Sequence, residues 1–351
     1  MSDNPIGIKG IDSLEFTTES LNTATPKLFE LMGFEKYSHQ SNKMDLYSQG
    51  QVRFLVNADN DDLHSRNYLK DHGEGVCKIS FLVENAEQAL EVAIKRGAVE
   101  KQNLQVIETE DGPIKTAQIQ GFGDVINEFV ERPTSLFRKG FSDQASGGSP
   151  LQTRVSRIDH LTNNVPYGEM EHWVDFYKRI YGFVETRYFD IKGQKTGLYS
   201  KVVQLKNNQV IIPINQPEVE DGQSQIQEFL DLHKGAGVQH IALMTPDIIS
   251  TVAELRSRDV KFLNIPSTYY EDIPNRPFKI DEHIPTLEEN QLLVDGDAEG
   301  YLLQIFSETY VGPLFFEYIQ RKKHWGFGEG NFNALFTAIE RDQIKRGYLK
   351  N

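Results

Sequence analysis

The chain has 351 residues and a net charge of −14 at pH 7; 38% of the residues are hydrophobic and 25% are charged, a composition typical of a globular protein of about two domains. The acidic charge and the absence of any Lys and Arg cluster argue against binding to nucleic acid or an anionic membrane surface. Because no apolar run approaches the roughly 20 residues that span a bilayer, no signal peptide is evident and Cys77 is the single cysteine, the sequence predicts a cytoplasmic protein.

The first half of the chain predicts one module of alternating strands and helices. Its segments, in order, are GIDSLEF (10–16), the helical PKLFELMGFEKY (26–37), GVCKISFLV (75–83), the amphipathic AEQALEVAIKRGA (86–98) and VINEFVER (125–132). Strand-type segments therefore enclose two helices, as expected for an α+β fold.

A stretch rich in Ser and Gly, SDQASGGSP (142–150), is the best candidate for a linker. We therefore predict two domains, residues 1–141 and 151–351, and compare them with each other.

The second half repeats the pattern of the first in the same order. Its segments are RIDHLTN (157–163), VDFYKRIYGFVETRY (174–188), GVQHIALMT (237–245), IISTVAELRSRDV (248–260) and FFEYIQR (315–321). The growing offset between the halves predicts an insertion at 266–290, which is rich in Pro and acidic residues and reads as an irregular loop. Two modules, each built from a twice-repeated unit of strand, helix and several strands, follow from this comparison.

The two halves differ at positions that carry chemistry. The aligned pairs are Ser13 and His160, Lys78 and His240, and Glu128 and Glu317. A structural histidine would rarely differ from its repeat mate at both strand positions, so the paired imidazoles of the second half indicate function. Glu317 lies between apolar strand residues, where a carboxylate is costly unless it is paired or binds a metal.

Two imidazoles and one carboxylate form the facial triad of non-haem Fe(II) oxygenases, which leaves positions open for substrate and O2. Zinc accepts the same ligands. The separations match no short metal motif, and a strand histidine is more often an ordinary core residue, so the residues alone leave the triad and a purely structural role open.

Seven segments in order identify the chain as similar to one known family. They are DHLTNNV (159–165), IIPINQP (211–217), SQIQEFL (224–230), GVQHIAL (237–243), YLLQIF (301–306), FFEYIQR (315–321) and GFGEGNF (326–332). The two-module plan resembles the vicinal oxygen chelate fold, and the chain resembles the 4-hydroxyphenylpyruvate dioxygenases. The resemblance implies open, barrel-like sheets of paired βαβββ repeats, with a C-terminal helix that covers the site.

The resemblance also implies the site residues. It places the iron ligands, one Fe(II) per chain, at His160, His240 and Glu317. It places the substrate pocket at Ser200, Asn215, Gln225, Gln239, Gln304, Phe306, Phe315, Phe327 and Phe332. We expect Gln239 to contribute less, because strand alternation directs it away from His240.

The implied reaction is the oxidative decarboxylation of 4-hydroxyphenylpyruvate by O2 in tyrosine catabolism, with ring hydroxylation and side-chain migration to homogentisate. A homo-oligomer, a dimer or tetramer, is expected. The alternatives are a hydroxymandelate synthase, which hydroxylates the side chain; an extradiol ring-cleaving dioxygenase; and a scaffold that kept only the fold.

Overall fold

Two eight-stranded sheets with the same strand order form the frame of the molecule. The computed structural model describes residues 4–134, 137–193, 196–220, 222–332, 334, 339–340, 343–344 and 346–349. The first sheet runs β2 (Glu35–Ser38), β3 (Met44–Gln49), β4 (Val52–Asn57), β1 (Ile8–Thr17), β5 (Gly75–Val83), β8 (Ile126–Glu131), β7 (Ile114–Gln120) and β6 (Glu100–Ile107). The second runs β10 (Val184–Lys192), β11 (Gly197–Gln204), β12 (Ile211–Pro217), β9 (Arg157–Asn164), β13 (Gly237–Met244), β16 (Leu314–Lys322), β15 (Tyr301–Val311) and β14 (Leu293–Gly296).

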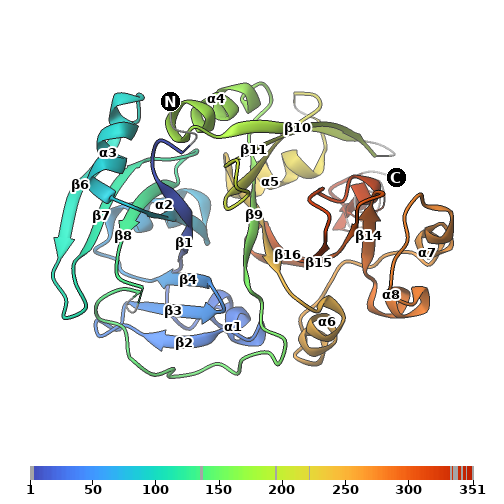
Figure 1. Ribbon diagram of the computed structural model, residues 1–351, viewed down its shortest axis with the longest axis horizontal. Coiled ribbons are helices and arrows are strands. Elements are labelled where there is room, and N and C mark those ends of the chain that lie inside the picture. The colour runs from blue at the N-terminus through green and yellow to red at the C-terminus, as the bar shows by residue number, and fades with distance from the viewer. Residues whose placement is uncertain are drawn as a thin grey trace.

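The predicted repeat is visible strand by strand. β1, β5 and β8 occupy in the first sheet the places that β9, β13 and β16 occupy in the second. In both sheets the first two of these strands pair antiparallel and the last two pair parallel. The two halves lie side by side, with β9 near the middle of the view (Figure 1).

Four of the described helices lie at predicted places: α1 (Ala24–Leu31) and α3 (Ala86–Lys95) in the first half, and α4 (Met170–Tyr181) and α6 (Ile248–Ser257) in the second. The helices α2 (Leu63–His72) in the first half and α5 (Gln225–His233) in the second were not predicted. Asn85 and Asp247 occupy equivalent positions of the repeat. Their side chains accept hydrogen bonds from backbone amides in the first turns of α3 and α6. Gly33 and Gly182 follow α1 and α4 with φ of 80° and 74°, and they end each helix where the sequence reads Gly-Phe.

The inserted segment is more regular than expected. Within 266–290 the chain forms α7 (Thr268–Glu271), a 3-10 turn η1 (Ile273–Asn275) and α8 (Ile284–Asn290). Tyr269, Ile273 and Leu287 are buried, and the Tyr269 hydroxyl donates to the Val294 carbonyl of β14 at 3.0 Å. Burial of these side chains stabilises short helices that the composition did not indicate.

One hydrophobic core extends through both halves. Phe316 of β16 lies edge-on to Phe29 of α1, with ring centroids 6.2 Å apart, and the Asn127 amide of β8 donates to the Tyr181 hydroxyl of α4. The division into domains at 142–150 stays a prediction. Among the described residues no helix is long and apolar enough to cross a membrane.

The C-terminal helix is described only in part. The 3-10 turn η2 (Glu329–Asn331) precedes Phe332, and Phe332, Ala334, Ile339, Glu340, Gln343, Ile344 and Arg346 have helical backbone. Residues 335–338 of the expected C-terminal helix lie outside the described residues.

Candidate metal centre and substrate cavity

Three central strands of the second sheet bring the predicted ligands together. Ala242 of β13 pairs with His160 of β9 on one side and with Glu317 of β16 on the other. Directly paired residues project to the same face of a sheet. His240 lies two residues before Ala242 and therefore shares that face, and the small alanine side chain leaves the three polar groups room to converge.

The ligand-type atoms of His160, His240 and Glu317 all lie within 4.8 Å of one another. The Nε2 atoms of the two imidazoles are 3.3 Å apart. Glu317 Oε2 is 3.2 Å from His160 Nε2 and 3.5 Å from His240 Nε2. The side chains are 4%, 12% and 3% exposed in chain order, so the group is almost closed to water.

The outward nitrogen of each imidazole is held by an acceptor. His160 Nδ1 is 2.9 Å from Asp159 Oδ2, and His240 Nδ1 is 3.0 Å from Gln239 Oε1. When these Nδ1 atoms carry the proton, both Nε2 lone pairs face Glu317, as in metal-binding histidines whose second nitrogen donates to a neighbour. The Arg321 guanidinium in turn donates to both oxygens of Asp159, at 2.8 and 2.7 Å.

The two imidazoles of this group differ in pKa. Burial opposes the imidazolium at His160, but the Glu317 carboxylate and the hydrogen bond to Asp159 outweigh it and raise the pKa of His160 to about 9. Burial and the neighbouring His160 lower the pKa of His240. Asp159 is held ionised, because the Arg321 guanidinium lowers its pKa despite burial. Two imidazole nitrogens and one carboxylate around a dry centre suit Fe(II) or Zn²⁺, with further positions open on the cavity side.

A cavity opens directly from the ligand group. Of the residues predicted for the substrate, those that line it are Ser200, Asn215, Gln225, Gln239, Phe306, Phe315, Phe327 and Phe332. The Phe315 ring stacks on the His240 imidazole, with centroids 4.9 Å apart. The structure thus brings the ligands and eight of the nine predicted pocket residues to one space.

Gln304 is not among the lining residues. It is 1% exposed, and it packs under Gly328, where a Cβ atom would lie 2.4 Å from its Nε2 atom. Gln304 therefore contacts the segment that carries Phe327. Strand alternation places it on the same face as Phe306, and its role in substrate binding stays a prediction.

The orientation expected for Gln239 is wrong. The pairing of β13 with β9 shifts register between Val238 and His240, and such a bulge breaks simple alternation. Gln239 consequently lines the same cavity as His240, and its Oε1 atom is hydrogen-bonded to His240 Nδ1.

Several cavity residues escaped the sequence reasoning: Thr162, Phe189, Ile191, Leu198 and Val202. Thr162 was accessible in principle, since it lies two residues after His160 and shares its face; its Oγ1 is 3.0 Å from His240 Nε2. Phe189 and Ile191 lie on the edge strand β10, where they alternate with the exposed Asp190 and Lys192. Alternation places them on one face of the strand but does not show that this face meets the cavity.

In the first sheet, positively charged side chains lie close to the positions that correspond to the predicted ligands of the second sheet. Lys78, the mate of His240, pairs with Glu15 at 2.8 Å. Arg138 Nη2 lies 2.5 Å from Glu128 Oε2. Among the described residues this sheet contributes no group of three metal-ligand side chains.

Comparison with known proteins agrees with this geometry. Residues 2–138 match the family model "Hydroxyphenylpyruvate dioxygenase, HPPD, N-terminal", and residues 157–272 match the "Glyoxalase/Bleomycin resistance protein/Dioxygenase superfamily". The chain is 41% identical to Hemolysin VllY of Vibrio vulnificus, over 99% of this chain and 98% of that protein. It is 40% identical to 4-hydroxyphenylpyruvate dioxygenase of Legionella pneumophila, over 99% of each.

A solved structure of a 4-hydroxymandelate synthase mutant from Streptomyces coelicolor superimposes with a TM-score of 0.83 at 25% identity, covering 96% of this chain and 99% of that one. The predicted α+β fold of two vicinal-oxygen-chelate modules is confirmed.

Proposed function

The chain belongs to the family of 4-hydroxyphenylpyruvate dioxygenases, and from this premise we propose that His160, His240 and Glu317 hold one Fe(II) per chain for that reaction. The activity is that of a non-haem dioxygenase, in which 4-hydroxyphenylpyruvate and O2 give homogentisate and CO2. The observation that carries the assignment is the convergence of two imidazole Nε2 atoms and one carboxylate at the floor of an apolar cavity.

The donor set fits the ion. Iron(II) bound there would accept the keto acid and O2 as further ligands and supply electrons for the reduction of O2. Asp159 and Gln239 hold the Nδ1 protons, so each imidazole presents its lone pair to the ion. One carboxylate leaves a bound divalent ion with net positive charge, which favours an anionic keto acid.

The cavity walls orient the substrate ring. Phe306, Phe315, Phe327 and Phe332 surround an apolar space, in which an aromatic ring gains from burial and offset contacts. Ser200, Asn215, Gln225 and Gln239 offer hydroxyl and amide groups to the phenol and the carboxylate. The apolar walls also disfavour water, which would compete for the open metal positions.

Product identification tests this function. We expect purified protein with Fe(II), 4-hydroxyphenylpyruvate and air to consume O2 and release CO2 and homogentisate in equal amounts. His240→Ala should lose iron and turnover with its circular dichroism unchanged, whereas His283→Ala, at the exposed residue that precedes α8, should behave as wild type.

The same measurement separates the alternatives. 4-Hydroxymandelate as the only product would mark a hydroxymandelate synthase, a ring-opened product would mark an extradiol enzyme, and near-normal turnover of His240→Ala would refute the ligand assignment. We also propose a cytoplasmic homo-oligomer, a dimer or tetramer, to be checked by fractionation and by light scattering.

A further inference from the structure

A second group of ligand-type side chains lies outside the substrate cavity. Asp295 belongs to β14, His324 follows β16 by two residues, and Glu329 opens η2. One nitrogen or oxygen from each lies within 4.8 Å of the other two. Residues from three separate segments thus meet at one point, and none of the three lines the cavity.

His324 is held as a metal-binding histidine is held. Its Nδ1 atom lies 3.3 Å from Asp297 Oδ2, which repeats the arrangement of His160 with Asp159. Its Nε2 atom is buried and has no hydrogen-bond partner among the described residues. The imidazole, 11% exposed, therefore directs an unpartnered nitrogen into the group.

The two carboxylates are also prepared for a cation. Asp295 Oδ2 accepts the Gly330 amide and Glu329 Oε2 accepts the Phe327 amide, each at 3.0 Å, and these bonds fix the carboxylates in place. Burial and the nearby Glu329 charge raise the pKa of Asp295.

Two arginines among the described residues lie near this group. Arg187 approaches Glu329 to 3.9 Å. Arg321 also interacts with the Glu329 charge, and it donates to the carbonyls of His324 and Gly326. Neither of these guanidinium groups donates a hydrogen bond to a Glu329 oxygen in the described part of the chain, so the carboxylate stays available to a metal ion.

Two glycines make this approach possible. A Cβ atom at position 326 would lie 2.3 Å from His324 Nε2 and 2.8 Å from Glu329 Oε2. A Cβ atom at position 330 would lie 2.4 Å from Asp295 Oδ1. Any larger residue at Gly326 or Gly330 would fill the space between the ligands.

We propose that Asp295, His324 and Glu329 bind one divalent transition-metal ion of the Zn²⁺ type, distinct from the iron centre. One imidazole and two carboxylates, with water as a fourth ligand, suit tetrahedral Zn²⁺. The general order of affinities places Zn²⁺ above Fe(II) at such a site, which makes Zn²⁺ the probe of choice.

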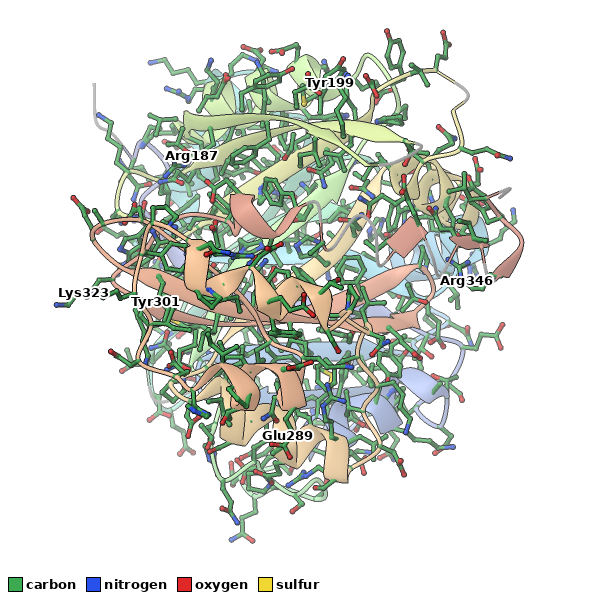
Figure 2. All side chains as sticks on the ribbon, turned by 90° about the vertical axis from the view of Figure 1, so that its right-hand side faces the viewer. Arg187, Tyr199, Glu289, Tyr301, Lys323 and Arg346 are labelled. Atoms are coloured by element: carbon green, nitrogen blue, oxygen red, sulfur yellow. The ribbon has the colours of Figure 1, made fainter. Side chains whose placement is uncertain are left out.

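The ion would crosslink three segments beside one wall of the substrate cavity. Phe327 lies between His324 and Glu329 in sequence, and Phe332 follows shortly after; both line the substrate cavity. The position of the group can be followed from two neighbouring residues, since Arg187 contacts Glu329 and Lys323 precedes His324. Both lie on the left of the view in Figure 2, whereas Arg346 lies on the right. An ion here would tie β14, the end of β16 and η2 together and fix the position of Phe327.

Zinc binding to the full chain, with Zn²⁺ alone as the probe at pH 7, tests the proposal. His240→Ala with Glu317→Ala removes the first centre and serves as the background. We expect one Zn²⁺ per chain in equilibrium dialysis of this background and none after adding His324→Ala. Asp295→Asn should weaken binding at least 30-fold, and Glu289→Gln, an exposed site on α8 distant from Arg187 in Figure 2, should not.

Hydrogen exchange supplies the second readout. Zn²⁺ should slow exchange of the Phe327 and Gly330 amides at least tenfold in the background, and not after His324→Ala. Absence of Zn²⁺ binding in the background, or binding that survives His324→Ala, would overturn the proposal. If His324→Ala fails to fold, Asp295→Asn and Glu329→Gln decide instead. Because product formation is not measured, the outcome is independent of the dioxygenase assignment.

Discussion

Two aspartates at equivalent positions of the repeat each pair with a buried arginine, but only one contacts a proposed metal ligand. Asp12 pairs with Arg132 at 2.8 Å and Asp159 with Arg321 at 2.7 Å, and both pairs are buried. Only Asp159 is also hydrogen-bonded to His160, a proposed metal ligand. The first pair therefore provides a control for the second within the same molecule.

We expect Asp12→Asn and Asp159→Asn each to lower the free energy of unfolding by about 3 kcal/mol, because each leaves a buried arginine with a weakened partner. Asp159→Asn alone should also weaken metal binding about 10- to 100-fold. Urea denaturation and metal titration measure the two effects. Equal loss of metal affinity in both variants would mean that the effect acts only through stability.

Phe332 forms part of the wall that presents the substrate ring. Its ring lies edge-on to Phe189 with centroids 5.1 Å apart, and both line the cavity. Phe332→Ile removes the flat surface but keeps an apolar side chain, so the protein should still fold. We expect a slower reaction and diversion of part of the product to 4-hydroxymandelate, as the ring tilts and the side-chain carbon nears the oxidant. Chromatography that finds homogentisate alone would assign Phe332 a packing role.

At the scale of elements, the strands of the first sheet carry buried ion pairs at two of the positions that correspond to the proposed metal ligands of the second. Burial opposes ionisation of Glu128, but the positive charges of Arg138 and Lys78 outweigh it, and the pKa of Glu128 is lowered to about 2 from 4.5. A lowered pKa stabilises the fold above the unfolded value, and this contribution is lost as the pH falls from about 4.5 towards 2. At about 1.4 kcal/mol per pKa unit it amounts to roughly 3 kcal/mol.

Arg138→Met tests this internal cation. At pH 7 the variant should be less stable than wild type by about 3 kcal/mol, because Glu128 stays buried with less compensation. The difference should shrink as the pH falls below about 4.5. Denaturation at several pH values gives the comparison, and a difference independent of pH would contradict the role of Glu128.

At the scale of the whole molecule, the core joins the two sheets. Phe316 is 1% exposed and contacts both Phe29 and Phe54 of the first half, with ring centroids 6.2 and 6.1 Å apart. A shared core of this kind couples the unfolding of both halves.

We expect a single unfolding transition, and Phe316→Ala should lower the free energy of unfolding by about 3–5 kcal/mol without splitting it. Calorimetry and circular dichroism should report the same midpoint. Phe16→Ala, within the first half, is the matched control. Two transitions, with Phe316→Ala shifting only one, would show that the halves fold independently.

The sequence by itself determined the repeat, the α+β class and the convergence of His160, His240 and Glu317. These follow from local patterns: alternation defines each strand, and repeat alignment places the three residues on strands that pair in both sheets. Ligand chemistry alone left a structural role for these residues open, and the resemblance of seven segments to one family favoured the metal site. The proposed iron and the role of each residue still depend on the experiments above.

Only the tertiary structure decided which side chains face the cavity and which support it. A register shift in β13 directs Gln239 into the cavity, and Gln304 lies against Gly328. Phe189, on the edge strand β10, lines the cavity. The clustering of Asp295 with His324 and Glu329 likewise joins three segments that no periodicity relates. Bulges and contacts between distant segments depend on the packing of the whole chain, so local patterns do not encode them one residue at a time.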